Sequence, residues 1–374
     1  MLNSLWHGFV ALVGLWLCIV VARDVFESII LPRTVARPFK LTSAFYRVFS
    51  AITRSIARRW KATRGPLLAA FGPISTIILL GIWAVGVMTG FAFMHWGMRS
   101  RFSSAPANLA ECFYVSGTTV FTLGLGDVAP VSPVARAITV VEAGMGLGLL
   151  AIVIGYIPVM YQAFSRREAG ISALDARAGS PPTACELLRR FIRSGDPNAF
   201  LALLLDLEKW CADLMESHIS YPVLCAYRSQ HDRQSWVASL TAMLDACALL
   251  KSGVENDAEW TQPLKWRAHL FFAMARHCVI DLVLVIGNSP RAMEGDRLPA
   301  DQLAELRGRL AEAGLILASG AEADDRLLQL RRQYEPYVHA LAISNVMELP
   351  PFMLADNAGD NWEVAAWDAK HFAA

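Results

Sequence analysis

The sequence predicts an all-α protein with a membrane-embedded helical part followed by an α-helical domain in water. Three observations support this fold class. First, 55% of the 374 residues are hydrophobic and only 18% are charged, which is more apolar than an ordinary soluble protein. Second, the apolar excess lies before residue 164, in uncharged runs long enough to cross a bilayer. Third, the remainder places apolar residues at helical spacings of three and four.

Charge and cysteine content separate the same two parts. Residues 1–164 contain 13 Lys and Arg against 5 Asp and Glu, a net charge of +8, whereas the remainder has 21 against 28, a net charge of −7. The seven cysteines are scattered without a Cys-x-x-Cys pair, and five lie in the second part. This usage is typical of a reducing cytoplasm and indicates neither a disulfide framework nor a zinc site. We expect no cofactor.

An N-terminal transmembrane helix is expected in 1–32. Residues 5–22 contain only His7 and Cys18 as mildly polar side chains, and this length reaches the lower limit for a span. The helix can continue until Pro32 stops it. A helix lying on the membrane is the weaker alternative, because the run has no polar face. It also lacks signal-peptide features, so we expect it to be retained.

A basic amphipathic segment follows at 33–66. It contains nine Lys and Arg and no acidic residue, with apolar residues interleaved at near-helical spacing. Such a helix is suited to lie on anionic lipid headgroups. A basic run can also bind nucleic acid, but one held between two membrane spans favours lipid, and we expect no nucleic-acid partner. By the positive-inside rule the segment is cytoplasmic, which puts the N-terminus outside.

Two more spans with a short helix between them are expected in 67–164. Residues 74–93 form an uncharged run of about 30 Å as a helix, and a third span is expected at 134–161. Between them, Pro106 indicates the first turn of a helix, which we expect at 106–119. That helix is too short to span, and the negative end of its dipole would favour cations.

The segment that follows this short helix cannot itself be a spanning helix. Gly124 and Gly126, one residue apart and followed by Asp127, weaken a helix and favour unusual backbone angles. Non-helical backbone at membrane depth persists only where protein buries it or where it lines a water-filled path. Carbonyl groups aimed at such a path require φ > 0 at alternate residues, which glycine tolerates. Thr122 at the inner end can add a hydroxyl oxygen.

The run Thr122-Leu123-Gly124-Leu125-Gly126-Asp127 resembles the filter signature of the potassium-channel pore family, usually Thr-Val/Ile-Gly-Tyr/Phe/Leu-Gly-Asp/Asn. The resemblance covers residues 67–164. This part of the chain is similar to bacterial channels with two membrane helices and one pore loop, and here an extra N-terminal helix precedes it. It implies a homotetramer that conducts K⁺, dehydrated by backbone oxygens from Thr122 to Gly126. Asp127 would lie at the filter mouth. An inner-membrane, multi-pass location with a cytoplasmic C-terminal domain follows.

Two leucines depart from the usual signature. Leu123 replaces Val or Ile, and Leu125 replaces the commonest Tyr, whose ring packing usually supports the filter. A non-selective cation channel is therefore one alternative. The other is a non-conducting membrane receptor that retains the pore fold as an anchor.

Two residues of the third span have open interpretations. Gly146 resembles the gating hinge of the family's inner helix by its position, but it could equally be a small residue at a helix contact. Glu142 is a lone carboxylate in a span, which is costly unless it faces water or a partner. It would either face the pore and concentrate cations or form a structural hydrogen bond toward the short helix, which we slightly favour.

The second part is expected to contain a linker at 165–183, a helical domain at 184–349 and a tail at 350–374. Its helices are expected at about 184–194, 197–217, 231–251, 262–286, 299–318 and 322–347. No Gly-x-Gly-x-x-Gly motif is present, which argues against the Rossmann-type domain of many bacterial channels. The domain would gate the pore, drive assembly, or bind a cytoplasmic ligand that the sequence does not identify.

Polar residues of the second part could form a site or belong to ordinary surfaces and cores. The region 216–232 is dense in polar and aromatic residues, and His269 and His277 lie two turns apart on one expected helix. A metal or ligand site can be drawn from these groups, but solvated faces and core histidines explain them equally well. No nucleophile elbow is present, so we do not expect an enzyme.

Overall fold

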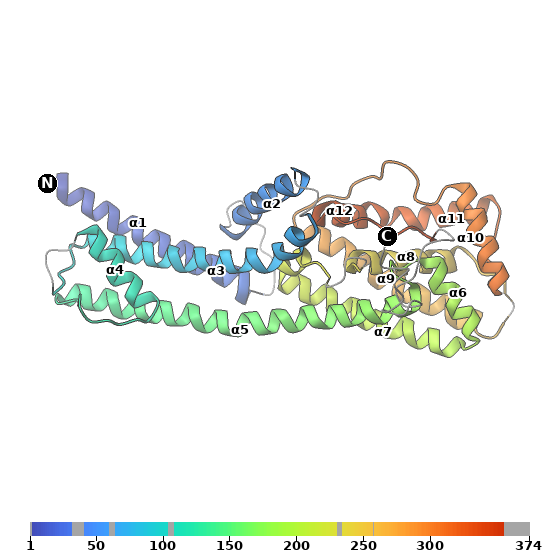
Figure 1. Ribbon diagram of the computed structural model, residues 1–374, viewed down its shortest axis with the longest axis horizontal. Coiled ribbons are helices and arrows are strands. Elements are labelled where there is room, and N and C mark those ends of the chain that lie inside the picture. The colour runs from blue at the N-terminus through green and yellow to red at the C-terminus, as the bar shows by residue number, and fades with distance from the viewer. Residues whose placement is uncertain are drawn as a thin grey trace, which may run out of the picture. The chain divides into compact units, whose positions relative to one another are not determined.

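The computed structural model describes residues 2–31, 41–59, 64–103, 108–229, 234–256 and 258–354 (Figure 1). In this described part, regular structure is helical and the only β pairing is in isolated bridges, which confirms the all-α class. The chain divides into two compact units, Met1–Tyr161 and Gln162–Ala374.

Four helices of the described chain are long and apolar enough to cross a membrane: Ser4–Ile30, Leu67–Gly97, Pro133–Ala178 and Thr261–Val285. The first three match the expected spans. The fourth belongs to the second unit, where it carries charged residues such as Lys265 and Arg276 and buries its apolar face against three neighbouring helices. Protein packing therefore accounts for its hydropathy.

Close contact of small residues joins α1 (Leu2–Val25) to α3 (Arg64–Gly97), which lie side by side (Figure 1). A Cβ on Gly90 would lie 2.9 Å from the carbonyl oxygen of Gly14 and would overlap the thiol of Cys18. Small residues let helix backbones approach closely in a membrane, where dispersion replaces the hydrophobic effect as the attraction.

One buried carboxylate connects the first three helices. Asp24 near the end of α1 accepts a hydrogen bond from Trp83 Nε1 of α3 at 2.8 Å. It also accepts from Thr42 Oγ1 at 2.6 Å and from the Thr42 amide, in the first turn of α2 (Leu41–Arg59). A carboxylate at a helix N-terminus is favoured by the helix dipole. The expected basic amphipathic helix within 33–66 is thereby attached to the spans through its described residues.

The second unit is built around α8 (Trp236–Ser252), of which nearly every residue is buried. It packs against α6 (Ala184–Ser194), α9 (Thr261–Val285) and α11 (Ala321–Arg332), while α7 (Pro197–Ser220) covers α9. The remaining helices are α10 (Ala300–Ala313) and α12 (Glu335–Asn345).

The expected linker at 165–183 is largely wrong. The helix α5 spans Pro133–Ala178 and contributes Ile171, Leu174 and Ala178 to the core of the second unit. Their spacing of three and four gives α5 an apolar face that another helix layer can bury. Only 179–183 connects α5 to α6, beginning at Gly179 with φ +84°.

The helix expected at 322–347 is also divided. It forms α11 (Ala321–Arg332) and α12 (Glu335–Asn345), with Pro336 in the first turn of α12. Proline has no amide hydrogen and disfavours helical geometry in the preceding residue, so a break just before it is the expected outcome.

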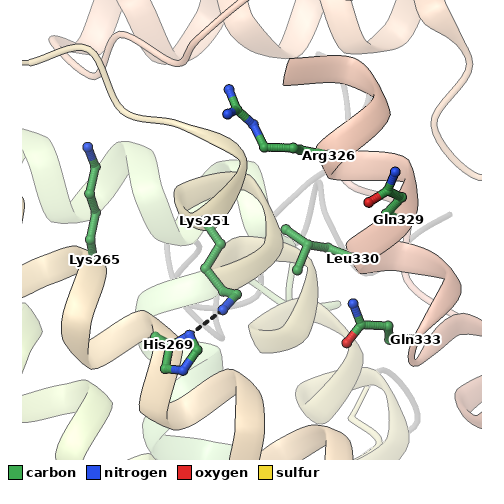
Figure 2. Close-up of a pocket in the computed structure, with 7 residues that line it drawn as sticks. All are labelled: Lys251, Lys265, His269, Arg326, Gln329, Leu330 and Gln333. Carbon is green, nitrogen blue, oxygen red and sulfur yellow. Dashed lines mark hydrogen bonds between the residues drawn. The ribbon is translucent and has the colours of Figure 1, made fainter. Parts of the chain in front are cut away.

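The helices α8, α9 and α11 enclose a cleft of about 380 Å³ on the second unit (Figure 2). All but one of its lining residues have a polar or charged side chain, and the lining consists of Lys251, Lys265, His269, Arg326, Gln329, Leu330 and Gln333.

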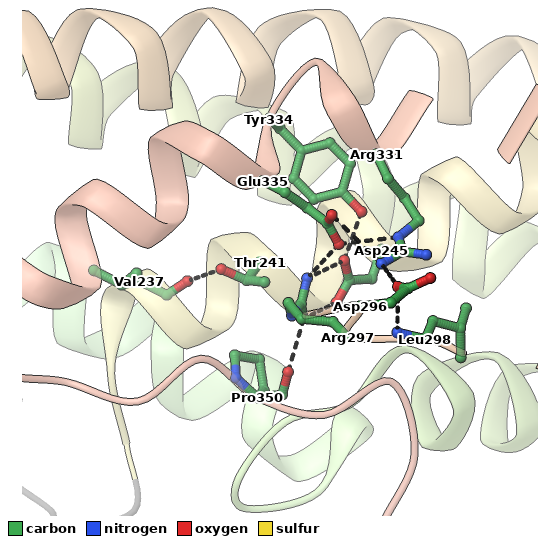
Figure 3. Close-up of polar contacts among 10 residues, drawn as sticks. All are labelled: Val237, Thr241, Asp245, Asp296, Arg297, Leu298, Arg331, Tyr334, Glu335 and Pro350. Carbon is green, nitrogen blue, oxygen red and sulfur yellow. Dashed lines mark hydrogen bonds and ion pairs between the residues drawn. The ribbon is translucent and has the colours of Figure 1, made fainter. Parts of the chain in front are cut away.

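A second group of polar contacts centres on Asp245, which is fully buried in α8 (Figure 3). Its carboxylate binds both Nη atoms of Arg297, at 3.1 and 2.7 Å, and accepts from Tyr334 Oη at 2.6 Å. Arg297 also donates to the carbonyl oxygen of Pro350, and its guanidinium lies over the ring of Phe352. The start of the expected tail thus packs on the domain, and residues beyond 354 lie outside the described part.

We predict that Asp245→Ala lowers the free energy of unfolding of the second unit by about 3–5 kcal/mol, because it leaves the buried Arg297 without its main partner. Thermal unfolding of the purified protein measures the loss. Asp206→Ala is the matched control, since Asp206 and its partner Lys209 are more than two thirds exposed and such pairs contribute about 0–1 kcal/mol. Equal effects of the two substitutions would contradict a structural role for the Asp245 network.

Candidate functional site

A short helix precedes the candidate filter. The helix α4 spans Leu109–Val120 and packs against α3 (Figure 1). The Asn108 side chain caps it by accepting the Glu111 amide at 2.8 Å. The helix therefore begins later than the 106–119 expected from Pro106, which lies outside the described residues. Twelve residues give about 18 Å, too short to span a bilayer.

The segment after α4 has left-handed backbone at alternate residues. The φ angles are +56° at Thr122, +57° at Gly124 and +77° at Gly126. The two glycines adopt the geometry that the sequence predicts for them. The same geometry at Thr122 was not foreseen, and it costs a residue with a β-carbon about 1–2 kcal/mol. Such strain at a non-glycine residue often marks a functional site.

Within the described part of the chain, the carbonyl groups of this segment accept no hydrogen bonds. The amides of Leu123 and Gly124 donate to the Thr118 carbonyl oxygen at 2.7 and 3.3 Å. No hydrogen bond from the described part of the chain reaches the carbonyl oxygens of residues 122–126, and all of these residues are exposed in the single chain. The oxygens are therefore available to water or to cations.

Hydrogen bonds fix the outer end of the segment. Tyr114 Oη of α4 donates to Asp127 Oδ2 at 2.7 Å, and Ser103 Oγ donates to the Asp127 carbonyl oxygen at 3.4 Å. The amide of Ser103 in turn donates to Ala129. The hydrogen bond from Tyr114 lowers the pKa of the Asp127 carboxyl below its usual value. A negative charge at this end at neutral pH follows.

Gly146 of α5 lies against the end of α4. A Cβ at this position would be 2.6 Å from the carbonyl oxygen of Val120, the last residue of α4. The small-residue contact is therefore present, while a hinge at Gly146 stays a prediction, since α5 is one continuous helix through it.

Glu142 faces a partner within its own chain. Its side chain is fully buried, and Oε2 lies 3.3 Å from Nε2 of His95, at the end of α3. The other ring nitrogen of His95 lies 2.9 Å from Ser100 Oγ. The carboxylate thus makes the structural hydrogen bond that we favoured, although its partner belongs to α3 rather than to the short helix α4. The sequence signal for a polar partner was the lone carboxylate of Glu142 within an apolar span, and this signal did not identify His95 as that partner.

We predict that Glu142→Gln leaves single-channel conductance near the wild-type value, because glutamine keeps an acceptor for His95. Glu142→Leu removes that acceptor and should destabilise the membrane part by about 1–3 kcal/mol. Planar-bilayer recording and thermal unfolding measure the two effects. A large conductance loss in the glutamine variant would instead favour a carboxylate that attracts ions.

The histidines singled out in the second unit do not meet. His269 lines the cleft of Figure 2, whereas His277 contacts Asp281 one turn along the same helix at 3.3 Å. No cluster of metal-ligating side chains occurs among the described residues. In the region 216–232, His218 is fully buried. The last residues of this region, from 230 onward, lie outside the described part of the chain.

Arg167 has a role that the sequence analysis missed. Its side chain is 1% exposed and donates to the carbonyl oxygens of Leu224 and Tyr227, each at 2.9 Å. Arg167 Nη1 also lies 3.2 Å from Nε2 of His218. Burial is the larger cause, and the positive charge of Arg167 the smaller one, that lowers the pKa of His218 well below its usual value. Arg167 therefore anchors the C-terminal part of α5 within the second unit.

Comparison with known proteins agrees with this geometry. Residues 77–163 match the model of a family described as ion channel. Over 222 residues the chain is 23% identical to the uncharacterized membrane protein YdjJ of Bacillus subtilis strain 168, covering 56% of this chain and 64% of the relative, less than two thirds of its length. No solved structure matches. The chain is a multi-pass membrane protein, and its similarity to the ion channel family over residues 77–163 supports an ion channel.

Proposed function

We propose that the protein is a potassium-selective channel in which four identical chains surround one ion path. The observation that carries this proposal is the alternation of φ > 0 at Thr122, Gly124 and Gly126 in a segment between α4 and α5. Alternation of this kind aims successive carbonyl groups in a common direction. Backbone oxygens arranged in this way can replace the hydration shell of K⁺.

Several chains are needed to enclose such a path. In one chain the filter segment is exposed, and polar backbone cannot face lipid. The membrane part of α5 also leaves large apolar side chains uncovered, including Val140, Leu147, Ile154 and Tyr161, which recur every seventh residue. A face with this repeat suits helix packing between copies. A closed ring of identical chains would cover both features.

Charge around the segment suits a cation. The C-terminal end of α4 is the negative end of its dipole and directly precedes the segment. Asp127 adds a carboxylate at the other end. The proposed ion therefore meets negative potential on both sides of the filter without any bound cofactor.

A non-selective cation channel is the second candidate. Leu123 and Leu125 are each more than 60% exposed in the single chain, so their side chains have little packing within it. A less supported filter would distinguish K⁺ from Na⁺ less strongly. The remaining alternative is a membrane receptor that does not conduct ions, and the flux experiment below distinguishes it from both kinds of channel.

The proposed orientation follows the positive-inside rule. The basic segment at 33–66, which contains α2, would lie on the cytoplasmic face of the inner membrane against anionic lipids, with the N-terminus outside. The second unit would then be cytoplasmic. We propose no nucleic-acid partner.

The second unit is proposed to gate the pore through α5. This helix carries Gly146 in the first unit and is anchored by Arg167 in the second. A bend at Gly146 would displace the end of α4, because the glycine lies against Val120. Ligand-induced rearrangement of the helical domain would reach the filter through these contacts.

We predict that purified protein in liposomes mediates K⁺ flux that exceeds Na⁺ flux, and that Gly124→Ala abolishes most of it. The φ of +57° at Gly124 disfavours alanine, although the added Cβ has no atom within 4 Å. Gly148→Ala is the matched control, because Gly148 also has open space within the chain but lies in ordinary helix. A concentrative ion-flux assay measures ion uptake by the wild-type protein and by the two variants.

The outcomes separate the candidate functions. Equal K⁺ and Na⁺ flux that Gly124→Ala abolishes would identify a non-selective channel. Flux that is unaffected by Gly124→Ala would contradict the filter assignment. The absence of flux from intact tetramers would favour the receptor that does not conduct.

A further inference from the structure

The cleft between α8, α9 and α11 concentrates positive charge. Lys251, Lys265 and Arg326 each come from a different one of these helices and border the same space (Figure 2). No acidic side chain is among the described residues that line it. The second unit has a net negative charge overall, so this basic cleft is not a consequence of average composition.

Two of the cations are held in place without a carboxylate. Lys251 Nζ lies 2.6 Å from Nδ1 of His269 and 5.1 Å from the ring centroid of Phe272. Burial is the main cause that lowers the pKa of Lys251 below its usual value. Lys265 Nζ donates to the carbonyl oxygen of Val254 at 3.1 Å.

The rest of the lining also offers donors. Arg326 forms an ion pair with Glu322, and both side chains are at least half exposed. Such a surface pair contributes little to the free energy of unfolding, so Arg326 can rearrange. The side-chain oxygen Oε1 of Gln333 accepts a hydrogen bond from Arg276 Nη1 at 2.8 Å. This bond orients the Gln333 amide and leaves its NH₂ group as a donor on the cleft side.

We propose that this cleft binds a phosphate-bearing anion, with Lys251, Lys265 and Arg326 neutralising its charge and Gln333 donating a further hydrogen bond. Three cations on three helices match an anion with more than one negative charge, such as a diphosphate group. Hydrogen bonds from charged donors to phosphate oxygens are among the stronger ones in proteins. The anion would also relieve the repulsion among the three cations.

The cleft has room for more than a phosphate group. Its volume of about 380 Å³ falls within the range of small-molecule sites. Leu330 supplies an apolar wall. Trp266, which is 62% exposed, does not itself line the cleft but is stacked against His269, which does. An organic group attached to the phosphate could lie on these surfaces. A nucleoside diphosphate and a phospholipid headgroup share the required chemistry.

The proposal is tested by calorimetric titration of inorganic pyrophosphate into the full-length protein in phosphatidylcholine nanodiscs at low salt. We expect a dissociation constant below about 1 mM. Arg326→Gln and Lys251→Gln should each weaken binding at least tenfold, and Lys251→Arg should restore most of it. Lys209→Gln is the matched control, because Lys209 is exposed on α7 and does not line the cleft.

Two further arms distinguish the source of the phosphate. Tighter binding of a nucleoside diphosphate than of pyrophosphate, lost in Trp266→Ala, would indicate a soluble nucleotide. Loss of pyrophosphate binding in nanodiscs that contain phosphatidic acid would indicate a lipid headgroup in the same cleft. The absence of pyrophosphate binding at 1 mM would overturn the proposal, as would affinity that is unchanged by Arg326→Gln and Lys251→Gln. These results do not depend on ion conduction.

Discussion

The carbonyl oxygens of residues 122–126 receive no hydrogen bond from the described part of the chain, and they lie in a segment between two apolar spans. A bilayer interior cannot satisfy such groups. They must therefore meet water, ions or other protein. The left-handed backbone at Thr122, Gly124 and Gly126 is consistent with this constraint, and the exposure of the segment in one chain is the reason that we propose a ring of several chains.

The surrounding helices hold this segment through two kinds of contact. Small residues permit close backbone approach, as where Gly146 lies against Val120 at the end of α4. Buried polar pairs then connect the helices, as Glu142 does with His95. Both kinds of contact determine which helices associate in a membrane, because moving an apolar side chain from lipid to protein lowers its free energy very little. The position of α4 consequently depends on α3 and α5 together.

The second unit differs because a hydrophobic core organises it. Its central helix α8 is buried on nearly every side, and the polar exceptions form defined groups. Asp245 is paired with Arg297 and Tyr334, which makes that group structural. The cations of the cleft have no such carboxylate partners in its lining. A buried charge with a buried partner therefore identifies a packing network, whereas cations without a carboxylate in the lining of their cleft identify a candidate ligand site.

The sequence by itself determined the features that depend on local backbone preference and on hydropathy. These include the three spans of the first unit, the limits of α6, and positive φ at Gly124 and Gly126. Only the tertiary structure decided which groups meet across long separations. It paired Glu142 with His95, carried α5 through the expected linker to Ala178, and brought Lys251 and Arg326 to one cleft. Periodicity identifies a buried face, but the partner of that face depends on packing among distant elements.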